Sequence, residues 1–240
     1  MPTIAFWNIG GIESPGRVAA LARSSDVDVL VLAECKLPIV GLLRALNAGQ
    51  ERLFFSDKGH SHRLVIFTRF QTDASTLVHD ALDVAIRHYR MPIGDAFLLV
   101  AVHLPSKLWS NTADQIIGST RVAGYIRDAE RRVGHARTVI IGDLNMNPFE
   151  AGVVGSGGLH AVMDRRIAAK GSRIVRGESC DFFYNPMWAH FGDAGSTPPG
   201  TYFYNSSSEV NYFWNIFDQV LIRPALLSSR ISQMQLSWMA

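Results

Sequence analysis

Short apolar runs recur along the whole chain, and their length predicts strands more often than helices. A continuous apolar run of only a few residues, bounded by polar or turn-forming residues, is typical of a strand that is covered on both faces. On this basis we expect strands at residues 3–8, 28–34, 64–67, 84–89, 97–104, 138–142, 201–204, 218–222 and 231–236.

Apolar residues at helical spacing predict helices between these strands. The longest covers residues 113–133, where Ile116, Val122 and Ile126 recur on one face. Ser14 followed by Pro15 predicts a helix start, with the helix running to about residue 24, and a shorter helix covers residues 39–46. Because helices lie between strands, we expect a mixed α/β fold with packed sheets, as one domain over residues 1–240.

Composition excludes several classes of protein. Apolar residues make up 48% of the 240 residues and charged residues 18%, which indicates a substantial core and argues against disorder. No secretory signal and no apolar run long enough to span a membrane is visible. Cys35 and Cys180 suggest no disulfide framework, so we expect free thiols and a cytoplasmic protein. A net charge of +2 does not by itself indicate a polyanionic partner.

Polar side chains follow several of the predicted strands where the apolar run ends. They are Asn8, Glu34, Asp143, Asn145 and Asp218. Such side chains are costly to bury unless a partner satisfies them. Clustered side-chain oxygens suit a hard cation such as Mg²⁺, which in turn suits phosphate chemistry.

Each of these residues also has an ordinary structural interpretation. Glu34 alone would be a surface glutamate at a loop, and a lone histidine such as His103, at the end of its strand, is more often structural than catalytic. If the chain is extended after residue 142, Asp143 and Asn145 share one side and Leu144 takes the other. The alternative is a turn rich in Asp and Asn, which the Asn-Pro pair at 147–148 favours.

The order of the motifs adds to what each indicates alone. They are Trp7-Asn8, Glu34, His103-Leu104, Gly142-Asp143-Leu144-Asn145 and Phe217-Asp218-Gln219. Together they resemble the endonuclease/exonuclease/phosphatase superfamily, whose motifs are an early Trp-Asn, a strand-end Glu, a late-strand His, Gly-Asp-x-Asn and a closing Ser-Asp-His. The resemblance spans about residues 4–223. It implies the DNase I-like fold, a four-layer αββα sandwich in which two packed mixed sheets are flanked by helices.

The resemblance also implies roles for the matching residues. Glu34 would hold Mg²⁺, with Mn²⁺ as an alternative, and Asn8 would lie beside the metal and help to place the phosphate. Asp143 would orient or activate the attacking water, while Asn145 would bind the scissile phosphate. Asp218 would complete the acidic floor and contact a metal.

Further roles follow at the edge of the site. His103 would contact a phosphate oxygen or the leaving group. Family members carry an Asp that supports the terminal His, for which Asp181 is the candidate and Asp193 the rival.

One position departs from the family pattern, because Gln219 stands where the terminal His is expected. A carboxamide donates a hydrogen bond but exchanges no proton near neutral pH. Positioned acid–base groups contribute roughly 10²- to 10⁴-fold to a rate. Gln219 therefore predicts a slow enzyme, chemistry moved to His103, or lost activity.

Several further segments bear on the substrate. A basic segment could meet a phosphate backbone or could be a solvated loop; it contains Arg165, Arg166, Lys170, Arg173 and Arg176. The aromatic residues that follow could stack bases but are more often core; they are Phe182, Phe183, Tyr184 and Trp188. Lys107 is a candidate phosphate contact at the rim, whereas His60 and His62 lack an evident third metal ligand.

The sequence thus predicts a Mg²⁺-dependent phosphodiesterase that acts on nucleic acid, with DNA favoured, and that has no membrane partner. A second interpretation is a phosphatase or phosphodiesterase for a small phosphoester such as a nucleotide or a phosphoinositide. A third, suggested by Gln219, is a non-catalytic nucleic-acid-binding module. The same catalytic floor would serve both enzymes, so the rim loops decide between them.

Overall fold

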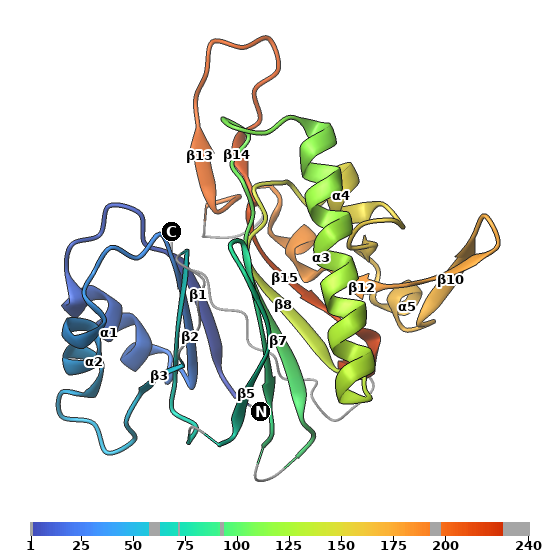
Figure 1. The fold of residues 1–240 in the computed structure, drawn as a ribbon. Coiled ribbons are helices and arrows are strands. Elements are labelled where there is room, and N and C mark those ends of the chain that lie inside the picture. Colours follow the sequence, from blue (N-terminus) through green and yellow to red (C-terminus); the bar gives the residue numbers. More distant parts are fainter. Residues whose placement is uncertain (1, 58–62, 72, 92–93, 193–197, 228–240) are drawn as a thin grey trace.

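Two β-sheets pack face to face in this protein, with helices on both outer sides (Figure 1). The structure is a computed structural model, and it describes residues 2–57, 63–71, 73–91, 94–192 and 198–227. The smaller sheet has the order β1-β2-β4-β3, and its strands are β1 (Ile4–Asn8), β2 (Val29–Ala33), β3 (Phe55–Asp57) and β4 (Leu64–Thr68).

The larger sheet holds the later strands in the order β5-β6-β7-β8-β15-β12-β9. These are β5 (Ser75–Ala81), β6 (Val84–Tyr89), β7 (Phe97–His103), β8 (Thr138–Asp143), β15 (Asp218–Ile222), β12 (Phe183–Tyr184) and β9 (Ala161–Val162). Two hairpins stand apart from both sheets; they pair β10 (Ser172–Val175) with β11 (Glu178–Asp181), and β13 (Tyr202–Tyr204) with β14 (Phe213–Asn215).

The helices lie on the two outer faces of the sandwich (Figure 1). Those of the first half are α1 (Pro15–Ser24) and α2 (Ile39–Asn47), and those of the second half are α3 (Thr112–Val133), α4 (Ala151–Val154) and α5 (Arg165–Ala168). Short 3₁₀ turns cover Pro186–His190 and Pro224–Leu226. Asn111 caps α3 by accepting from the N–H of Asp114, and Gly134 ends it in a left-handed conformation with φ 75°.

Strand alternation divides the interior into three hydrophobic cores, one for each contact between layers. Leu30 and Leu32 of β2 face α1 and α2, whereas Val29 and Val31 face the second sheet. In β7, Val100 and its even-numbered neighbours face α3, while the odd-numbered residues join the central core. These buried apolar faces are what an αββα sandwich requires, and the predicted fold class is confirmed.

The sheet topology brings several strand ends to one edge of the sandwich. β1 runs parallel to β2, so Asn8 and Ala33 pair at their carboxyl ends. β7 runs parallel to β8 and β15 runs antiparallel to it, so that His103 and Asp218 both pair with Asp143. β1 and β2 lie opposite β8 across the central core. Polar residues that are far apart in the sequence therefore meet at this edge.

The structure confirms most predicted elements and corrects others. The predicted helices and the strands up to residue 222 are present, and within the described residues no helix is long and apolar enough to cross a membrane. The short strands β3, β9, β12 and β14, the β5 strand and the β10–β11 hairpin were not predicted. The strand expected at residues 231–236 lies outside the described residues.

Candidate active site

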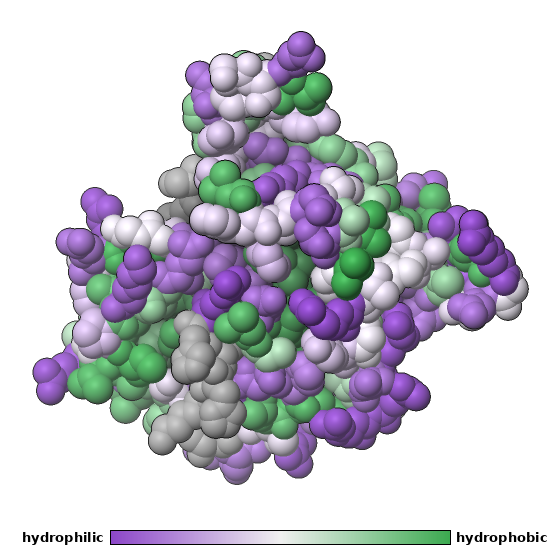
Figure 2. All heavy atoms as spheres, turned by 45° about the horizontal axis from the view of Figure 1, so that its top comes forward, coloured by the Kyte–Doolittle hydropathy of each residue, from purple (hydrophilic) through white to green (hydrophobic). Residues whose placement is uncertain are grey.

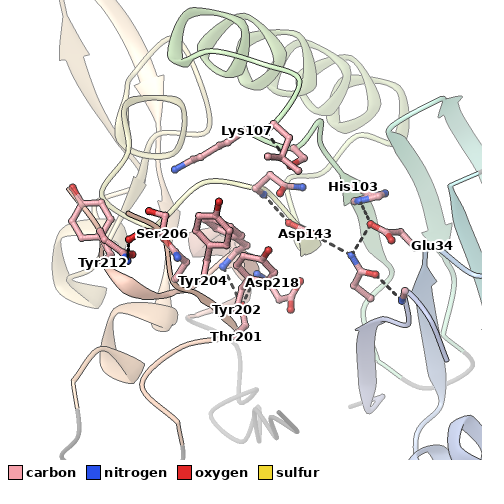
Figure 3. Close-up of a pocket in the computed structure, with 18 of the residues that line it drawn as sticks. Glu34, His103, Lys107, Asp143, Thr201, Tyr202, Tyr204, Ser206, Tyr212 and Asp218 are labelled. Carbon is pink, nitrogen blue, oxygen red and sulfur yellow. Dashed lines mark hydrogen bonds and ion pairs between the residues drawn. The ribbon is translucent and has the colours of Figure 1, made fainter. Parts of the chain in front are cut away.

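A pocket of about 650 Å³ opens at the edge where these strands end (Figure 3). Its floor is formed by the polar residues that the sequence predicts, and one wall is formed by the β13–β14 hairpin. The floor residues that line it are Asn8, Glu34, His103, Asp143, Asn145 and Asp218.

Asn8 connects the two sheets at the floor. Its Nδ2 donates to Glu34 Oε1 at 3.2 Å and to Asp143 Oδ2 at 3.3 Å, and its Oδ1 accepts from the N–H of Gly10 at 3.1 Å. Glu34 lies just after β2 with φ 52°, a left-handed backbone that non-glycine residues adopt rarely. A Cβ atom at Gly10 would lie 2.7 Å from Glu34 Oε2, so the glycine leaves the space that the carboxylate occupies.

Asp143 lies at the centre of the floor. Its Oδ1 accepts the N–H of Asn145 at 2.8 Å, which leaves Oδ2 toward Asn8. Burial of the carboxylate raises the pKa of Asp143 above its usual range, against the opposing effects of the Asn145 N–H, His103 and Asn8. The preceding Gly142 has φ 149°, and a Cβ there would lie 1.9 Å from the carbonyl oxygen of Val102. The glycine therefore permits the close β7–β8 approach that positions Asp143.

Asp218 faces Asp143 from the neighbouring strand. Burial, and then the charge of Asp143, raises the pKa of Asp218 to about 8. The hydroxyl of Thr201 accepts the N–H groups of Phe217 and Asp218, both at 3.1 Å, and so holds the start of β15 against the base of the β13–β14 hairpin. Two carboxylates that resist ionisation side by side form a site that favours positive charge.

The loop after β8 fixes Asn145 beside this pair. Asn145 has φ 50°, and its Nδ2 donates to the carbonyl of Leu104 at 2.8 Å. Gln115 of α3 donates to the carbonyl of Asn145 at 2.8 Å. Asp143 and Asn145 line the pocket while Leu144 lies in the α3 core, but a left-handed turn rather than an extended chain produces this arrangement.

His103 and Lys107 form the side of the pocket nearest to α3. The His103 Nε2 lies 3.4 Å from Glu34 Oε1, while its buried Nδ1 has no hydrogen-bond partner among the described residues. Lys107 pairs with Glu150, and its Nζ lies 5.3 Å from the centre of the Phe217 ring. Both predicted residues therefore line the pocket.

Gln219 does not take the place that the sequence suggested. It is 1% exposed and is not among the described residues that line the pocket. Its amide donates to the carbonyls of Met146 and Ile216 at 2.5 and 3.0 Å and accepts from Asn185 Nδ2 at 2.9 Å. Because successive strand residues face opposite sides, Asp218 points to the pocket and Gln219 points away from it.

Other predicted residues also lie elsewhere. Asp181 ends the β10–β11 hairpin, and the residue bonded to Gln219 is Asn185; Asp193, His60 and His62 lie outside the described residues. Arg173 and Arg176 belong to the same hairpin, which projects to one side of the molecule, and neither is among the described residues that line the pocket (Figure 1). The aromatic residues of the 182–188 segment are mainly structural, with Phe182 and Phe183 buried.

The donor set fits a hard divalent cation in its chemistry. Carboxylate and carboxamide oxygens of Glu34, Asp143, Asp218 and Asn8 converge on one pocket, and these are the ligand atoms that Mg²⁺ prefers. Within the described chain, no three His, Cys, Asp or Glu side chains are grouped closely enough to hold an ion as they stand. The NH₂ group of Asn8 lies between Glu34 and Asp143 and donates to both. Two carboxylates thus already turn toward one donor, as they would toward a cation.

The aromatic wall of the pocket was not predicted. Tyr202, Tyr204 and Tyr212 line it from the hairpin, opposite Glu34 and His103 (Figure 3). The runs of three consecutive aromatic residues at 202–204 and 212–214 were the available signal, because a strand with large rings on both faces has more aromatic surface than a core can cover.

The chain matches one known protein family over nearly its whole length. The model of the family described as "Endonuclease/Exonuclease/phosphatase family" matches residues 5–235. No curated protein sequence matches the chain.

Solved structures with this fold include an endonuclease/exonuclease/phosphatase family protein from Bacteroides thetaiotaomicron, with 13% identity, TM-score 0.55, and coverage of 93% of this chain and 84% of that one. A mannosyl-6-phosphatase from the same organism gives 13% identity, TM-score 0.55, and coverage of 94% and 86%. D. rerio TDP2 complexed with a single-strand DNA product gives 18% identity, TM-score 0.52, and coverage of 92% and 82%.

Proposed function

Because the chain belongs to the endonuclease/exonuclease/phosphatase family, whose members are hydrolases of phosphoesters, we propose that it is a Mg²⁺-dependent phosphodiesterase that cleaves nucleic acid, with DNA favoured. The observation that carries the proposal is the meeting of Asn8 and Glu34 from one sheet with Asp143 and Asp218 from the other, in one pocket.

Glu34, Asn8 and Asp218 would hold the cation. A bound Mg²⁺ or Mn²⁺ supplies charge neutralisation for the phosphate in the transition state. The residues of the chain provide position: Asn8 fixes the Glu34 carboxylate relative to Asp143, and Gly10 leaves room for it. Each of these contacts organises the site before the substrate arrives.

Asp143 is the residue proposed to orient and deprotonate the attacking water. The N–H of Asn145 donates to one oxygen of the Asp143 carboxylate, and Asn8 donates to the other at 3.3 Å, so the water would share the second oxygen with Asn8. Asn145 Nδ2 donates one of its hydrogens to the carbonyl of Leu104. The second hydrogen of this amide is the proposed donor to a phosphate oxygen. In this scheme the water attacks in line with the leaving oxygen.

His103 is the proposed contact for the leaving group. It is the imidazole among the described residues that line the pocket, and its Nε2 faces Glu34. An imidazole exchanges protons near neutral pH, whereas Gln219 lies outside the pocket. We therefore assign proton delivery to His103, and phosphate binding at the rim to Lys107.

A phosphatase for a small phosphoester is the second candidate. The similarity to a mannosyl-6-phosphatase and the modest number of cations in the pocket favour it, because a long phosphate backbone normally meets several basic side chains. The nucleic-acid assignment is supported by the aromatic wall of the pocket. A non-catalytic binding module is the third, because the terminal imidazole of the family pattern is absent at Gln219.

The experiment compares wild-type protein with Asp143→Asn on single-stranded DNA, duplex DNA and small phosphomonoesters, with Mg²⁺ or with a chelator. We expect Mg²⁺-dependent cleavage of DNA, reduced roughly 10²- to 10⁴-fold by Asp143→Asn, with melting curves of both proteins to show that the variant is folded. Phosphate release from monoesters without DNA cleavage would establish the phosphatase instead. Metal-independent DNA binding without turnover would leave only the binding module.

We also propose a cytoplasmic location. Cys35 and Cys180 are both free thiols in the structure, as expected in a reducing compartment.

A further inference from the structure

The pocket has a wall of exposed tyrosine rings that the proposed chemistry does not use. Tyr202, Tyr204 and Tyr212 are 48%, 49% and 59% exposed, and all three line the pocket. Figure 2 shows the β13–β14 hairpin as a projection whose surface mixes pale and green residues with purple ones. Large rings that remain exposed beside a catalytic floor are typical of a binding surface.

The rings form a ladder that begins at the catalytic floor. Phe217, which precedes Asp218, stacks on Tyr202 with centroids 5.4 Å apart and planes at 23°. Tyr202 in turn stacks on Tyr204 at 6.3 Å and 15°. The near-parallel planes lead outward from Asp218, and the Thr201 hydroxyl fixes the base of the ladder to β15.

The face of the hairpin opposite the tyrosines carries aromatic residues of its own. Phe203 alternates to the opposite side of β13, where it packs on Trp214 at 5.1 Å and on Phe213 at 6.5 Å. β13 and β14 pair at three positions through their backbones. Phe203 and Phe213 are themselves 53% and 48% exposed, and on the tyrosine side Tyr212 has an edge contact with Phe149 at 5.6 Å. The tyrosine side is distinguished because its rings line the pocket, where a ligand can reach them.

The charges in the pocket favour a stacked ligand over a gripped phosphate backbone. Lys107 is the single lysine or arginine among the described lining residues, and Glu150 already pairs with it. A phosphate backbone, single- or double-stranded, is normally held by several cations, so one lysine leaves most of the contact to the rings. Neutral aromatic rings with hydroxyl tips suit planar unpaired bases, whose faces are available in a single strand but covered in a duplex.

We propose that Tyr202, Tyr204 and Tyr212 form a base-stacking subsite, so that the substrate is single-stranded nucleic acid whose unpaired bases lie on this ladder beside the scissile phosphate. The inference rests on the proposed function and narrows its substrate.

The test measures binding rather than cleavage. An Asp143→Asn background with Mg²⁺ prevents turnover, and fluorescence anisotropy follows three probes of equal length: a single-stranded DNA, the same strand as a duplex, and a sugar-phosphate strand without bases. We expect the single strand to bind best. Tyr204→Ala should weaken it on the order of 10- to 100-fold, and Tyr204→Phe should retain it, because stacking needs only the ring.

Trp109→Ala is the control for loss of an exposed ring, since Trp109 is 87% exposed and is not among the described residues that line the pocket. We expect it to leave the affinity unchanged. The subsite is overturned if the strand without bases binds equally well, if Trp109→Ala weakens binding as much as Tyr204→Ala, or if a hexose phosphate binds while the DNA strand does not.

Cleavage by the wild-type protein is measured separately, so that the two proposals fail independently. If DNA is hydrolysed but Tyr204→Ala binds normally, the stacking subsite is wrong and the proposed function stands. If base-dependent binding is found without hydrolysis, the subsite stands and the enzymatic proposal fails.

Discussion

At the scale of single residues, Gly10 controls where Glu34 can lie. A methyl group at this position would lie 2.7 Å from Glu34 Oε2, so Gly10→Ala should push the carboxylate away from Asn8. We expect weaker binding of Mn²⁺ or Mg²⁺ in calorimetric titrations, with little change in melting temperature because the residue is exposed.

Gly41→Ala provides the control for this change. Gly41 lies in α2, and a Cβ atom there would meet no other atom within 4 Å, so alanine should stabilise the helix by up to about 1 kcal/mol without altering metal binding. Equal metal affinity in wild-type protein and Gly10→Ala would show that Gly10 does not control the position of the Glu34 carboxylate.

Gln219 provides a second test at this scale, because its amide makes three buried hydrogen bonds. A neutral imidazole has one donor and one acceptor, so Gln219→His leaves at least one buried carbonyl without its donor. We expect a loss of about 1 to 3 kcal/mol in unfolding free energy and no gain in hydrolysis. Thermal unfolding and a rate assay check this. A faster enzyme of unchanged stability would mean that residue 219 faces the substrate.

These residues also mark what sequence patterns can predict. Asn8, Glu34 and Asp143 were predicted because each follows an apolar run whose end is unambiguous. The orientation of Gln219 was not predictable in the same way, since the face that a strand residue takes depends on the register with its partner strand. The pairing of Gln219 with Asn185 depends on the path of the chain between β11 and β15, which no local pattern specifies.

At the scale of elements, a buried ion pair joins α3 to the end of β15. Arg223 donates to both carboxylate oxygens of Glu130, at 2.9 and 3.1 Å, and to the carbonyl of Phe182 at 3.1 Å. Thr138 of β8 donates to the same carboxylate at 2.7 Å. The pair therefore connects a helix and two strands on the outer face of the larger sheet.

Removing one member of this pair should be costly. Glu130→Ala leaves the Arg223 guanidinium buried and unpaired, which we expect to lower the unfolding free energy by about 3 to 5 kcal/mol in urea titrations. The double variant Glu130→Leu with Arg223→Met should recover part of the loss, because no charge is then buried. A double variant less stable than Glu130→Ala would contradict this explanation.

The elements themselves were predictable in proportion to their length and burial. β2, β7 and β8 are continuous apolar runs, and α3 has a long helical repeat with an Asn cap. β9 and β12 have two residues each and exist because a neighbouring strand pairs with them. The tyrosine wall was missed because the predicted strand at 201–204 gave no indication that it would project from the sheets as part of a hairpin.

At the scale of the whole molecule, the site depends on how the two sheets are stacked. Each sheet contributes half of the acidic floor, and Asn8 spans the two halves through Glu34 and Asp143. Periodicity predicts the strands but not which sheets face each other, so the convergence followed from the family resemblance and the structure rather than from local patterns. A mutation that weakens the packing between the two sheets should therefore impair the site even when every residue of the floor is unchanged.

The larger sheet and its covering helix also share a pH-sensitive contact. His88 of β6 and His135, just after α3, approach each other with their Nε2 atoms 3.2 Å apart. Burial lowers the pKa of His88, with Arg90 and Arg137 acting in the same direction, and burial lowers the pKa of His135, with Arg137 and His88 adding to the effect. The folded protein therefore resists protonation of a pair that the unfolded chain protonates below about pH 6.5.

The sign of the effect follows from this difference. As pH falls below about 6.5, the unfolded state takes up protons that the folded state does not, so stability declines until the folded pair is protonated as well. His88→Gln should reduce the fall in melting temperature between about pH 7.5 and 5.5, because it removes one histidine that only the unfolded state protonates readily. It also removes the imidazole whose positive charge opposes protonation of His135. Melting curves of wild-type protein, His88→Gln and His135→Gln at both pH values measure this. If both variants lose as much stability on acidification as the wild type, the contact between β6 and α3 does not set the acid response of the molecule.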